Sequence, residues 1–417
     1  MSHAILKEVI ARYRTSRDFS GLHFRPTRTT AERAEAATWI RDGLVAVVSE
    51  KDYPNPHIRP WPIRRSIDEQ AADVEKMVPD SYGVCLYPTA AALKRSRTRR
   101  KYPDEPYRQA MADGRGTLEL RYFETTVLEQ YRNDPRFSFQ YGDFGVNTVI
   151  SDEAYIDNEE LDKDKIIMSH IGFAYDLSGY DAKDVNSLVV RRVCAFYGDL
   201  AKLSPEHQQR WKTYESVPQD GLRPHPAWMD TQMGRWADGV GPFGRFMYEL
   251  EALNELQEIA FGAPGLFRST ERPREFGWIL RPSQSEWDQF IHQLDKLLSE
   301  NLSSEALNKL GAPEANDAGQ NLGTLARLGA ALVVKGDSPD VAKRVMAPLR
   351  EVRSTRQRPA HALRTNATDG TFVHKQVDLM HRVNQSLVSL REFWQSHPAN
   401  AAWEQADYIH DGKNYRV

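Results

Sequence analysis

After residue 280, apolar side chains recur every three or four positions, which is the spacing of one face of a helix. Four such stretches follow one another, separated by turns that contain Gly, Pro or Asn. Residues 281–417 are therefore predicted to form an all-α four-helix bundle. The apolar positions are Trp287, Phe290, Ile291, Leu294, Leu297, Leu298 and Leu302; then Leu322, Leu325, Leu328 and Leu332; then Val341, Val345, Leu349 and Val352; then Val373, Val377, Met380, Leu387 and Trp394.

The first 115 residues show a mixed pattern of helices and short strands. Two short apolar runs, at 44–49 and 82–88, have the length and composition of buried strands. Between them, the proline-rich segment 53–65 is incompatible with regular structure. Directly after this segment, Ser66 and Glu69 have the spacing of a capping box and predict the start of a helix.

Residues 116–280 are predicted to form an α+β region that is rich in strands and ends in a long helix. Ser204, Pro205 and Glu206 predict the N-terminus of a shorter helix after the strands. The strands are predicted at 117–127, 137–142, 146–151, 166–175 and 189–200. The long helix is predicted from Phe243, with apolar positions Phe246, Met247, Leu250, Leu253, Leu256 and Ile259 and with Gly262 at its end.

The composition defines the class of protein. A chain of 417 residues that is 40% apolar can bury a sizeable core, and its length predicts two or three domains, here 1–115, 116–280 and 281–417. The net charge of −3 argues against a protein that coats nucleic acid, although a local basic patch is compatible with it. Cys85 and Cys194 lack any framework spacing, so we expect buried structural thiols in a reducing cytosol. With no apolar run of membrane length, a cytoplasmic protein without membrane contact is predicted.

Three patterns have both a chemical and a structural interpretation. Gly239–Gly244 matches the glycine pattern of dinucleotide sites, but helical sequence leads into it and no βαβ unit surrounds it. Residues 94–101 contain six cations, which suit phosphate contacts but also a solvated helix end. His374, Asp378 and His381 share one helix face and suit zinc, although such stripes are more commonly polar surface or a subunit contact. We therefore predict no metal and no cofactor.

The segment Arg356-Gln-Arg-Pro-Ala-His361 lies between the third and fourth predicted helices. With four to six residues between them, arginine and histidine occur three times, about as often as chance predicts, so spacing alone is uninformative. Arg356 differs because it continues the apolar stripe of its helix, and a buried cation is unfavourable unless it is paired or faces a wet cleft or another subunit. In the structural alternative, Arg356 pairs with Asp295 or Glu300 of the first helix and His361 caps a helix. The other two pairs are Arg17/His23 and Arg391/His397.

Arg356 and His361 converge only if the helix ends or bends between them. Five residues along an ideal helix leave two side chains about 140° apart. Pro359 disfavours helical geometry at Arg358 and removes a backbone hydrogen bond, so the chain can bend at this point. The bend would let both side chains face one groove.

A four-helix bundle with Arg-x4–6-His between its third and fourth helices resembles the HEPN (higher eukaryote and prokaryote nucleotide-binding) ribonuclease domain. Gln357, a polar residue after the arginine, and the Ala360-His361 ending are also similar to the family's motif. The resemblance covers residues 281–417. It implies a metal-independent endoribonuclease with a composite site in a homodimer, and a setting in phage defence or a toxin-like system. Some members are non-catalytic, so the alternative is a dimerisation or interaction module that acts as a scaffold.

The residues of the motif suit RNA cleavage. His361 would act as general base or acid on the RNA 2′-OH or the leaving 5′-oxygen. Arg356 would stabilise charge in the transition state, and Gln357 would position the phosphate or orient the histidine. Residues 1–280 would sense a trigger or bind a regulatory protein partner. Further contacts to backbone phosphates are predicted for Arg353, Arg358 and Arg364.

Overall fold

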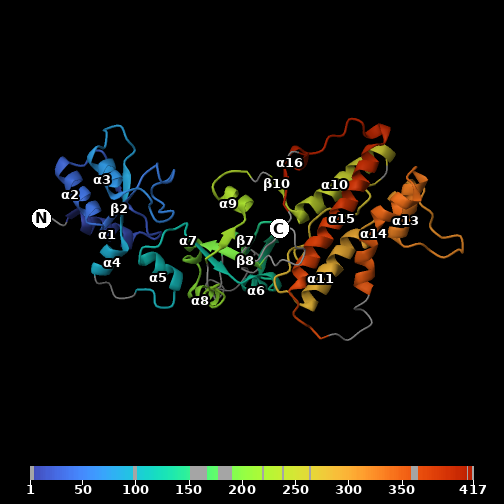
Figure 1. Ribbon diagram of the computed structural model, residues 1–417, viewed down its shortest axis with the longest axis horizontal. Coiled ribbons are helices and arrows are strands. Elements are labelled where there is room, and N and C mark those ends of the chain that lie inside the picture. The colour runs from blue at the N-terminus through green and yellow to red at the C-terminus, as the bar shows by residue number, and fades with distance from the viewer. Residues whose placement is uncertain are drawn as a thin grey trace.

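The structure is a computed structural model of the chain, shown in Figure 1. Along its longest axis, a lobe of helices and strands, a sheet, and a group of long helices follow one another in chain order. The chain is thus a mixed α/β protein with a helical C-terminal region, as the sequence predicted at this level. The described residues are 4–96, 101–150, 167–176, 190–217, 220–236, 239–262, 264–357, 365–410 and 412–415.

The N-terminal lobe contains a three-stranded antiparallel sheet in the order β1-β3-β2. Both predicted strands are confirmed as β2 and β3, which pair with Val47 opposite Leu86. The predicted capping box is also confirmed, because the Ser66 and Glu69 side chains each accept a hydrogen bond from the other residue's backbone N–H. The elements are α1 (Ala4–Thr15), β1 (Leu22–Phe24), α2 (Thr30–Arg41), β2 (Val45–Val48), α3 (Ile67–Glu75), β3 (Val84–Pro88), α4 (Ala90–Arg95) and α5 (Pro106–Ala112).

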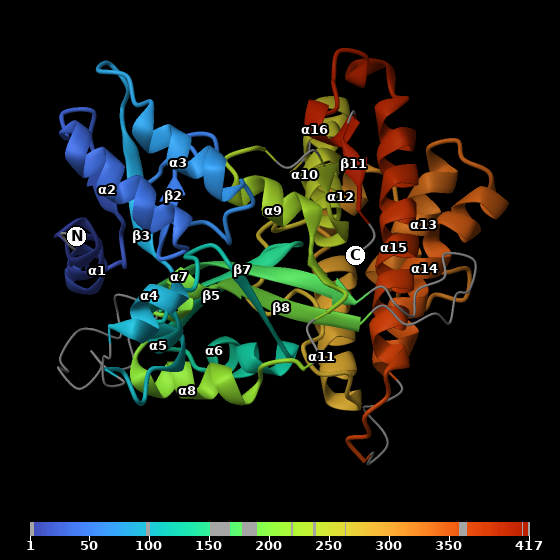
Figure 2. The same ribbon diagram turned by 60° about the vertical axis from the view of Figure 1, so that its left-hand side comes forward.

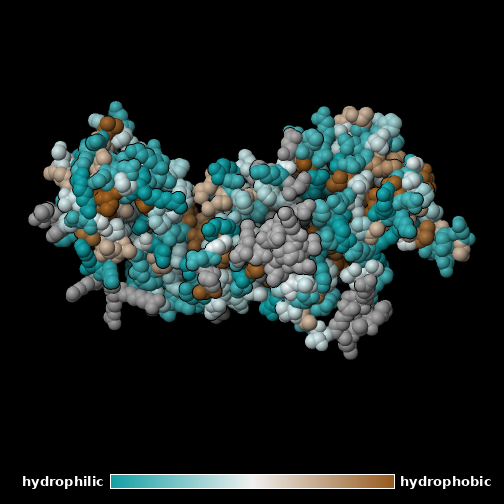
Figure 3. Space-filling view, in the orientation of Figure 1, coloured by the Kyte–Doolittle hydropathy of each residue, from teal (hydrophilic) through white to brown (hydrophobic). Residues whose placement is uncertain are grey.

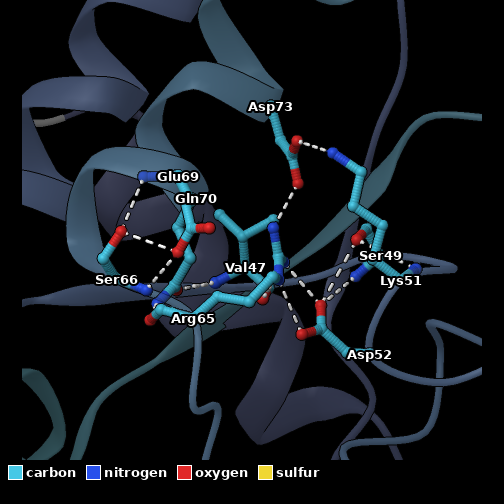
Figure 4. Close-up of polar contacts among 9 residues, drawn as sticks. All are labelled: Val47, Ser49, Lys51, Asp52, Arg65, Ser66, Glu69, Gln70 and Asp73. Carbon is cyan, nitrogen blue, oxygen red and sulfur yellow. Dashed lines mark hydrogen bonds and ion pairs between the residues drawn. The ribbon is translucent and has the colours of Figure 1, made fainter.

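A polar cluster fixes the proline-rich segment to this lobe (Figure 4). Arg65, the last residue of the segment, donates to Asp52 through Nε at 2.7 Å and to Asp73 through Nη1 at 2.5 Å. Lys51 Nζ also contacts Asp73, at 2.7 Å. Each carboxylate has a cation beside it, so we interpret this cluster as a structural tie between α3 and the loop after β2.

The central sheet is antiparallel, in the order β4-β8-β7-β6-β5, and β9 pairs with β7. All five predicted strands are present, three of them in nearly the predicted positions, and α8 begins after the predicted N-cap, Ser204. The elements are β4 (Leu120–Phe123), a 3-10 turn (Thr125–Leu128), α6 (Glu129–Asn133), β5 (Phe137–Tyr141), β6 (Gly145–Ile150), β7 (Ile167–Asp176), β8 (Val190–Phe196), α7 (Tyr197–Leu200), α8 (Pro205–Thr213), β9 (Leu222–Pro224) and α9 (Pro226–Gln232).

Two predicted strands are too long. The strand predicted at 117–127 ends at Phe123, after which the chain forms the 3-10 turn. The strand predicted at 189–200 ends at Phe196, because Tyr197 begins α7 and donates its N–H to the Glu119 carbonyl at 3.0 Å. A short apolar run is compatible with both helical and strand periodicity, so the sequence alone does not show where these two strands end.

All four helices predicted after residue 280 are present, in the predicted order. The short strand β11 was not predicted; it pairs in parallel with β10, just before α10. Whether these helices form a HEPN-like bundle stays a prediction. The elements are β10 (Gly239–Val240), α10 (Pro242–Phe261), α11 (Gln284–Asp295), a π turn (Lys296–Glu300), α12 (Ser304–Lys309), α13 (Thr324–Val334), α14 (Pro339–Gln357), α15 (Thr371–Gln395), a 3-10 turn (Pro398–Asn400), α16 (Asp407–His410) and β11 (Lys413–Asn414).

The long helix α10 lies along α15 (Figures 1 and 2). Gly262 ends α10 in the left-handed conformation, with φ of 55°, as predicted. Five of the six predicted apolar positions are buried, whereas Ile259 is exposed. Between the two helices, Glu249 forms an ion pair with Arg391 at 2.8 Å. The helical region therefore includes a helix that precedes residue 281.

The apolar core is nearly continuous through the molecule. One cluster of buried side chains includes Tyr87 in the N-terminal lobe, Phe173 in the central sheet and Leu387 in α15. A second cluster, around Val47 and Leu86, fills the lobe between its sheet and α2 and α3. On the face shown in Figure 3, apolar residues are scattered over a mainly hydrophilic surface. Within the described part of the chain, no helix has the length and apolarity needed to cross a membrane.

Candidate functional site

Arg356 lies in the last turn of α14, on the side of this helix that faces α11. Leu349 and Val352 of the predicted stripe are buried, and Val345 is half-buried. The side chain of Arg356 is 25% exposed, so the guanidinium is at the edge of the core and not within it. The stripe is therefore confirmed, and the cation that ends it meets both the helix interface and solvent.

Two carboxylates pair with Arg356, and they are the two that the structural alternative named. Arg356 Nη1 donates to Asp295 Oδ2 at 2.5 Å and also to Glu300 Oε1. Arg353, one turn earlier, donates through its own Nη1 to the same Asp295 oxygen at 2.8 Å. Ser299 Oγ completes this set with a hydrogen bond of 2.7 Å to Asp295 Oδ1. We call these five residues the Asp295 cluster.

Asp295 is charged in this cluster although its side chain is completely buried. Burial raises the pKa of this carboxyl, but the hydrogen bonds from Arg356, Ser299 and Arg353 outweigh burial and hold its pKa below the usual range. Nearby His292 has a lowered pKa, because of burial first and of Arg356 and Lys296 second. A buried carboxylate and two arginines thus meet at the end of α14.

The π turn that follows α11 explains why both carboxylates reach one arginine. On a regular helix, residues five apart differ by about 140° in direction. A π turn closes on i→i+5 hydrogen bonds, so it brings residues five apart onto the same face. Asp295 and Glu300 are five apart across the turn Lys296–Glu300, and both contact Arg356 Nη1. Turns of this kind are frequent at functional sites.

A groove of about 570 Å³ lies beside the cluster, between α14, α13 and the π turn. Arg350, Arg353 and Gln357 line it and are three and four residues apart, so they share one face of α14. Ser299, Glu300 and Thr324 are among the lining residues on the opposite side. We call this space the arginine groove. Two of the residues predicted to bind RNA, Arg353 and Gln357, thus line one cavity, and Arg356 contacts Glu300, another of its lining residues.

Many arginine donors around this groove are unused. Arg353 and Arg356 contact the cluster only through Nη1, so the Nε and Nη2 donors of both have no partner among the described residues. Arg350 is exposed and has no hydrogen bond or ion pair within the same part of the chain. Arg350 and Arg353 line the groove with unused donors, and Arg356 lies beside it on the neighbouring side of α14, where it contacts the lining residue Glu300. Several such guanidinium groups suit an anionic ligand with several oxygens.

The second half of the predicted motif lies outside the described residues. This applies to His361, Arg358 and Arg364, so the distance between Arg356 and His361 is not given by the structure. The description resumes at Thr365, and Ser285 N at the start of α11 donates to Asn366 Oδ1 at 3.0 Å. The structure therefore brings together Arg353, Arg356 and Gln357, and leaves the histidine as a prediction.

The glycine pattern at 239–244 is occupied by the protein itself. Asp143 Oδ2 accepts a hydrogen bond from Gly244 N at 2.8 Å, at the N-terminus of α10. A Cβ on Gly241 would come within 2.4 Å of the Asp143 side chain, so glycine is needed there for this approach. Asp143 is also paired with Arg272 at 3.1 Å. The helix end that would bind a phosphate in a dinucleotide fold thus holds an internal carboxylate.

The stripe on α15 does not assemble a metal site. Asp378 pairs with Arg382 at 2.8 Å, and His381 Nε2 lies 3.0 Å from Gln385 Nε2. Within the described ranges, no group of three or more His, Cys, Asp or Glu side chains is arranged to hold a metal ion. The polar-surface interpretation therefore fits this stripe better.

The remaining sequence candidates are structural where the description reaches them. The cysteines are confirmed as buried free thiols, and burial raises the pKa of Cys85 to about 12. A nucleophilic thiolate is therefore disfavoured at either position. Lys94 and Arg95 form the exposed end of α4, as expected for a solvated helix end. Residues 97–100 of that basic run and the acidic segment 152–164 lie outside the described residues.

Two residues of the site were missed from the sequence. Arg350 is three residues before Arg353, and Ser299 is four residues after Asp295, so helical spacing contains a signal for both. Comparisons of the chain with protein-family models, curated proteins and solved structures find no match. Any proposal about function therefore rests on the geometry of the groove and on the residues of the motif.

Asp295→Asn is expected to destabilise the protein by about 1–3 kcal/mol at pH 7, since it removes the charged acceptor of two arginines. The folded-state pKa of Asp295 is lowered, so its contribution is complete above the unfolded pKa of about 4 and is lost as the pH falls through the folded value. The difference between wild type and variant should therefore shrink in acid. Urea unfolding at pH 7 and thermal melting between pH 7 and pH 3 measure both effects.

The control for this experiment is Asp378→Asn, because Asp378 is 64% exposed and pairs only at the surface of α15. Its expected cost is about 0–1 kcal/mol. Equal losses for the two variants at pH 7 would show that the buried cluster contributes no more than a surface pair.

Proposed function

We propose that the C-terminal region is a HEPN-type endoribonuclease that cleaves RNA as a homodimer and without a metal ion, in a phage-defence or toxin-like setting. Residues 1–280 would then form the region that senses a trigger or a regulatory protein. The observation that carries this proposal is the arginine groove. Arg350 and Arg353 line it with unused donors, Arg356 contacts its lining residue Glu300, and the chain continues from it directly into the segment with His361.

The groove suits the backbone of an RNA strand. Guanidinium groups bind phosphate oxygens through paired N–H donors, and such contacts position a strand without reading its sequence. Asp295 holds Arg353 and Arg356 by one N–H each, which fixes both side chains while their other donors stay available. In this function Asp295 and Ser299 are positioning residues, whereas Arg356 contacts the phosphate.

The proposed reaction is an intramolecular transfer. His361 of one subunit removes the proton of a ribose 2′-OH, and the 2′-oxygen attacks the adjacent phosphorus. Arg356 stabilises the charge that develops on the phosphoryl oxygens. The bond from phosphorus to the 5′-oxygen breaks, and His361 of the second copy gives a proton to that oxygen. The products are a 2′,3′-cyclic phosphate and a 5′-hydroxyl end.

One observation favours a second candidate, a non-catalytic scaffold module. Asp295 and Glu300 neutralise Arg356 at the contact between α11 and α14, which a purely structural arginine would also require. Glu300 is 47% exposed, so an incoming phosphate has access to Arg356 and can displace this carboxylate. The first candidate requires that displacement, whereas the second requires Glu300 to stay paired with Arg356. RNA cleavage therefore separates the two functions.

Arg356→Lys is expected to slow cleavage by about tenfold or more, because lysine keeps the charge and loses the planar fork of donors. The assay uses the full chain, single-stranded RNA and excess EDTA, and identifies the product ends. The matched control is Arg344→Lys, at an exposed position of α14 that does not line the groove, and it should cleave like wild type. Wild-type protein that leaves RNA intact in this assay, and also in the presence of its cellular partners, would favour the scaffold.

A further inference from the structure

A second cavity lies between the N-terminal lobe and the central region, far along the chain from the arginine groove. Its volume is about 430 Å³. One wall is the segment after α1, with Arg17 and Phe19; the other consists of Arg108 on α5 and of Lys202 after α7. Figure 2 shows α5 and α7 side by side at this end of the molecule. We call this space the lobe pocket.

The charge of the lobe pocket is positive. Arg17, Arg108 and Lys202 line it, and Asp18 is the single carboxylate among the lining residues. Arg17 is exposed and has no hydrogen bond, ion pair or ring contact with a described residue. The other two are weakly neutralised: Arg108 lies 3.1 Å from Glu105, and Lys202 lies 3.7 Å from Asp199, each at least a third exposed. Three cations from three segments thus surround one cavity.

The wall that carries Arg17 has a strained backbone. Phe19 is the one non-glycine residue with positive φ in the described part of the chain, at 52°. Its ring is buried against Tyr13, with centroids 5.5 Å apart, and its N–H reaches the Ser16 carbonyl. Ser20 N also donates to Ser16 Oγ at 3.1 Å. Packing and hydrogen bonds hold this turn in a costly conformation, which is common where a backbone shapes a ligand site.

We propose that the lobe pocket binds a small phosphorylated organic molecule, with its phosphate held by Arg17, Arg108 and Lys202. A phosphate monoester has three terminal oxygens and up to two negative charges, which three cations match better than they match a carboxylate. The cavity is within the size range of small-molecule sites and larger than a phosphate needs. Phe19, Ile58 and Met111 supply apolar surface for the organic part. This inference is independent of the proposed nuclease.

The test is calorimetric titration of the full chain at low salt with AMP and with ribose 5-phosphate. Both are expected to bind with a Kd below about 1 mM, and adenosine and ribose at least about tenfold more weakly. Each of the variants Arg17→Ala, Arg108→Ala and Lys202→Ala should bind AMP about tenfold more weakly or worse. Asp18→Asn should strengthen binding by about twofold or more, because it removes the opposing charge.

Two control variants separate this pocket from general basic charge. Arg64→Ala removes an exposed arginine of the same lobe, and Arg350→Ala removes one from the arginine groove; both should bind AMP like wild type. Far-UV circular dichroism and melting temperature establish that each variant is folded. Absence of saturable binding for both phosphate esters overturns the inference. The inference is also overturned if all three pocket variants still bind AMP like wild type, or if Arg350→Ala abolishes AMP binding.

Discussion

Replacing His361 by alanine is expected to slow RNA cleavage by about 10²–10⁴-fold, which is the usual contribution of a general acid or base. In the proposed homodimer the loss is expected at the larger end, because the same substitution removes both the base and the acid. Binding of RNA should change little, since the arginine groove is untouched. Single-turnover cleavage in EDTA gives the rate, and fluorescence anisotropy of a labelled RNA gives the affinity.

The matched control is His397→Ala. It belongs to another Arg–His pair with four to six intervening residues, and its Nδ1 caps a short turn through Ala399 N at 3.3 Å. Its partner Arg391 is buried and ion-paired with Glu249, so this pair has a structural explanation. Cleavage by His361→Ala at the wild-type rate would eliminate the motif as the active site. An active protein that sediments strictly as a monomer at micromolar concentration would contradict the composite site.

Glu249→Ala is expected to cost about 3–5 kcal/mol of unfolding free energy, because it leaves Arg391 as a buried cation without its partner. Glu249 is completely buried, and Arg391 is 4% exposed. Arg245 pairs with the other carboxylate oxygen at 2.7 Å. Burial raises the pKa of Glu249, and the two arginines oppose this only in part. Urea unfolding at pH 7 measures the loss.

A double variant and a surface pair test the reason for this loss. Glu249→Leu combined with Arg391→Leu should recover much of the stability, since a buried ion pair is commonly replaceable by apolar residues. Glu351→Ala breaks the surface pair with Arg382, where both side chains are at least a third exposed, and should cost less than about 1 kcal/mol. If the double variant is no more stable than Glu249→Ala, the loss reflects altered packing and not an unpaired charge.

Helix positions in the C-terminal region could be predicted from the sequence, because apolar spacing and end signals are local. The prediction for α10 included its start near Phe243 and its end at Gly262. Its partner could not be predicted, since α15 begins more than a hundred residues later and periodicity contains no information about which faces meet. The ion pair between Glu249 and Arg391 follows from that unpredictable contact.

The candidate site was predictable to a similar extent. Arg356 stood out as a cation on an apolar stripe, and Asp295 and Glu300 were named as its possible partners. The structure shows that both contact it, through a π turn that no sequence pattern announced. Regular helical geometry directs these two carboxylates apart, so periodicity alone favours one partner or the other. The role of His361 stays a prediction, since the residue lies outside the described ranges.

The continuous core has a consequence for how such a chain can evolve. Buried side chains of one cluster extend from Tyr87 through Phe173 to Leu387, across both boundaries predicted near residues 115 and 280. Recombination at either boundary would separate apolar faces that are buried only against each other, and would expose them to water. The lobe, the sheet and the long helices are therefore expected to be inherited together, and not exchanged as independent modules between unrelated proteins.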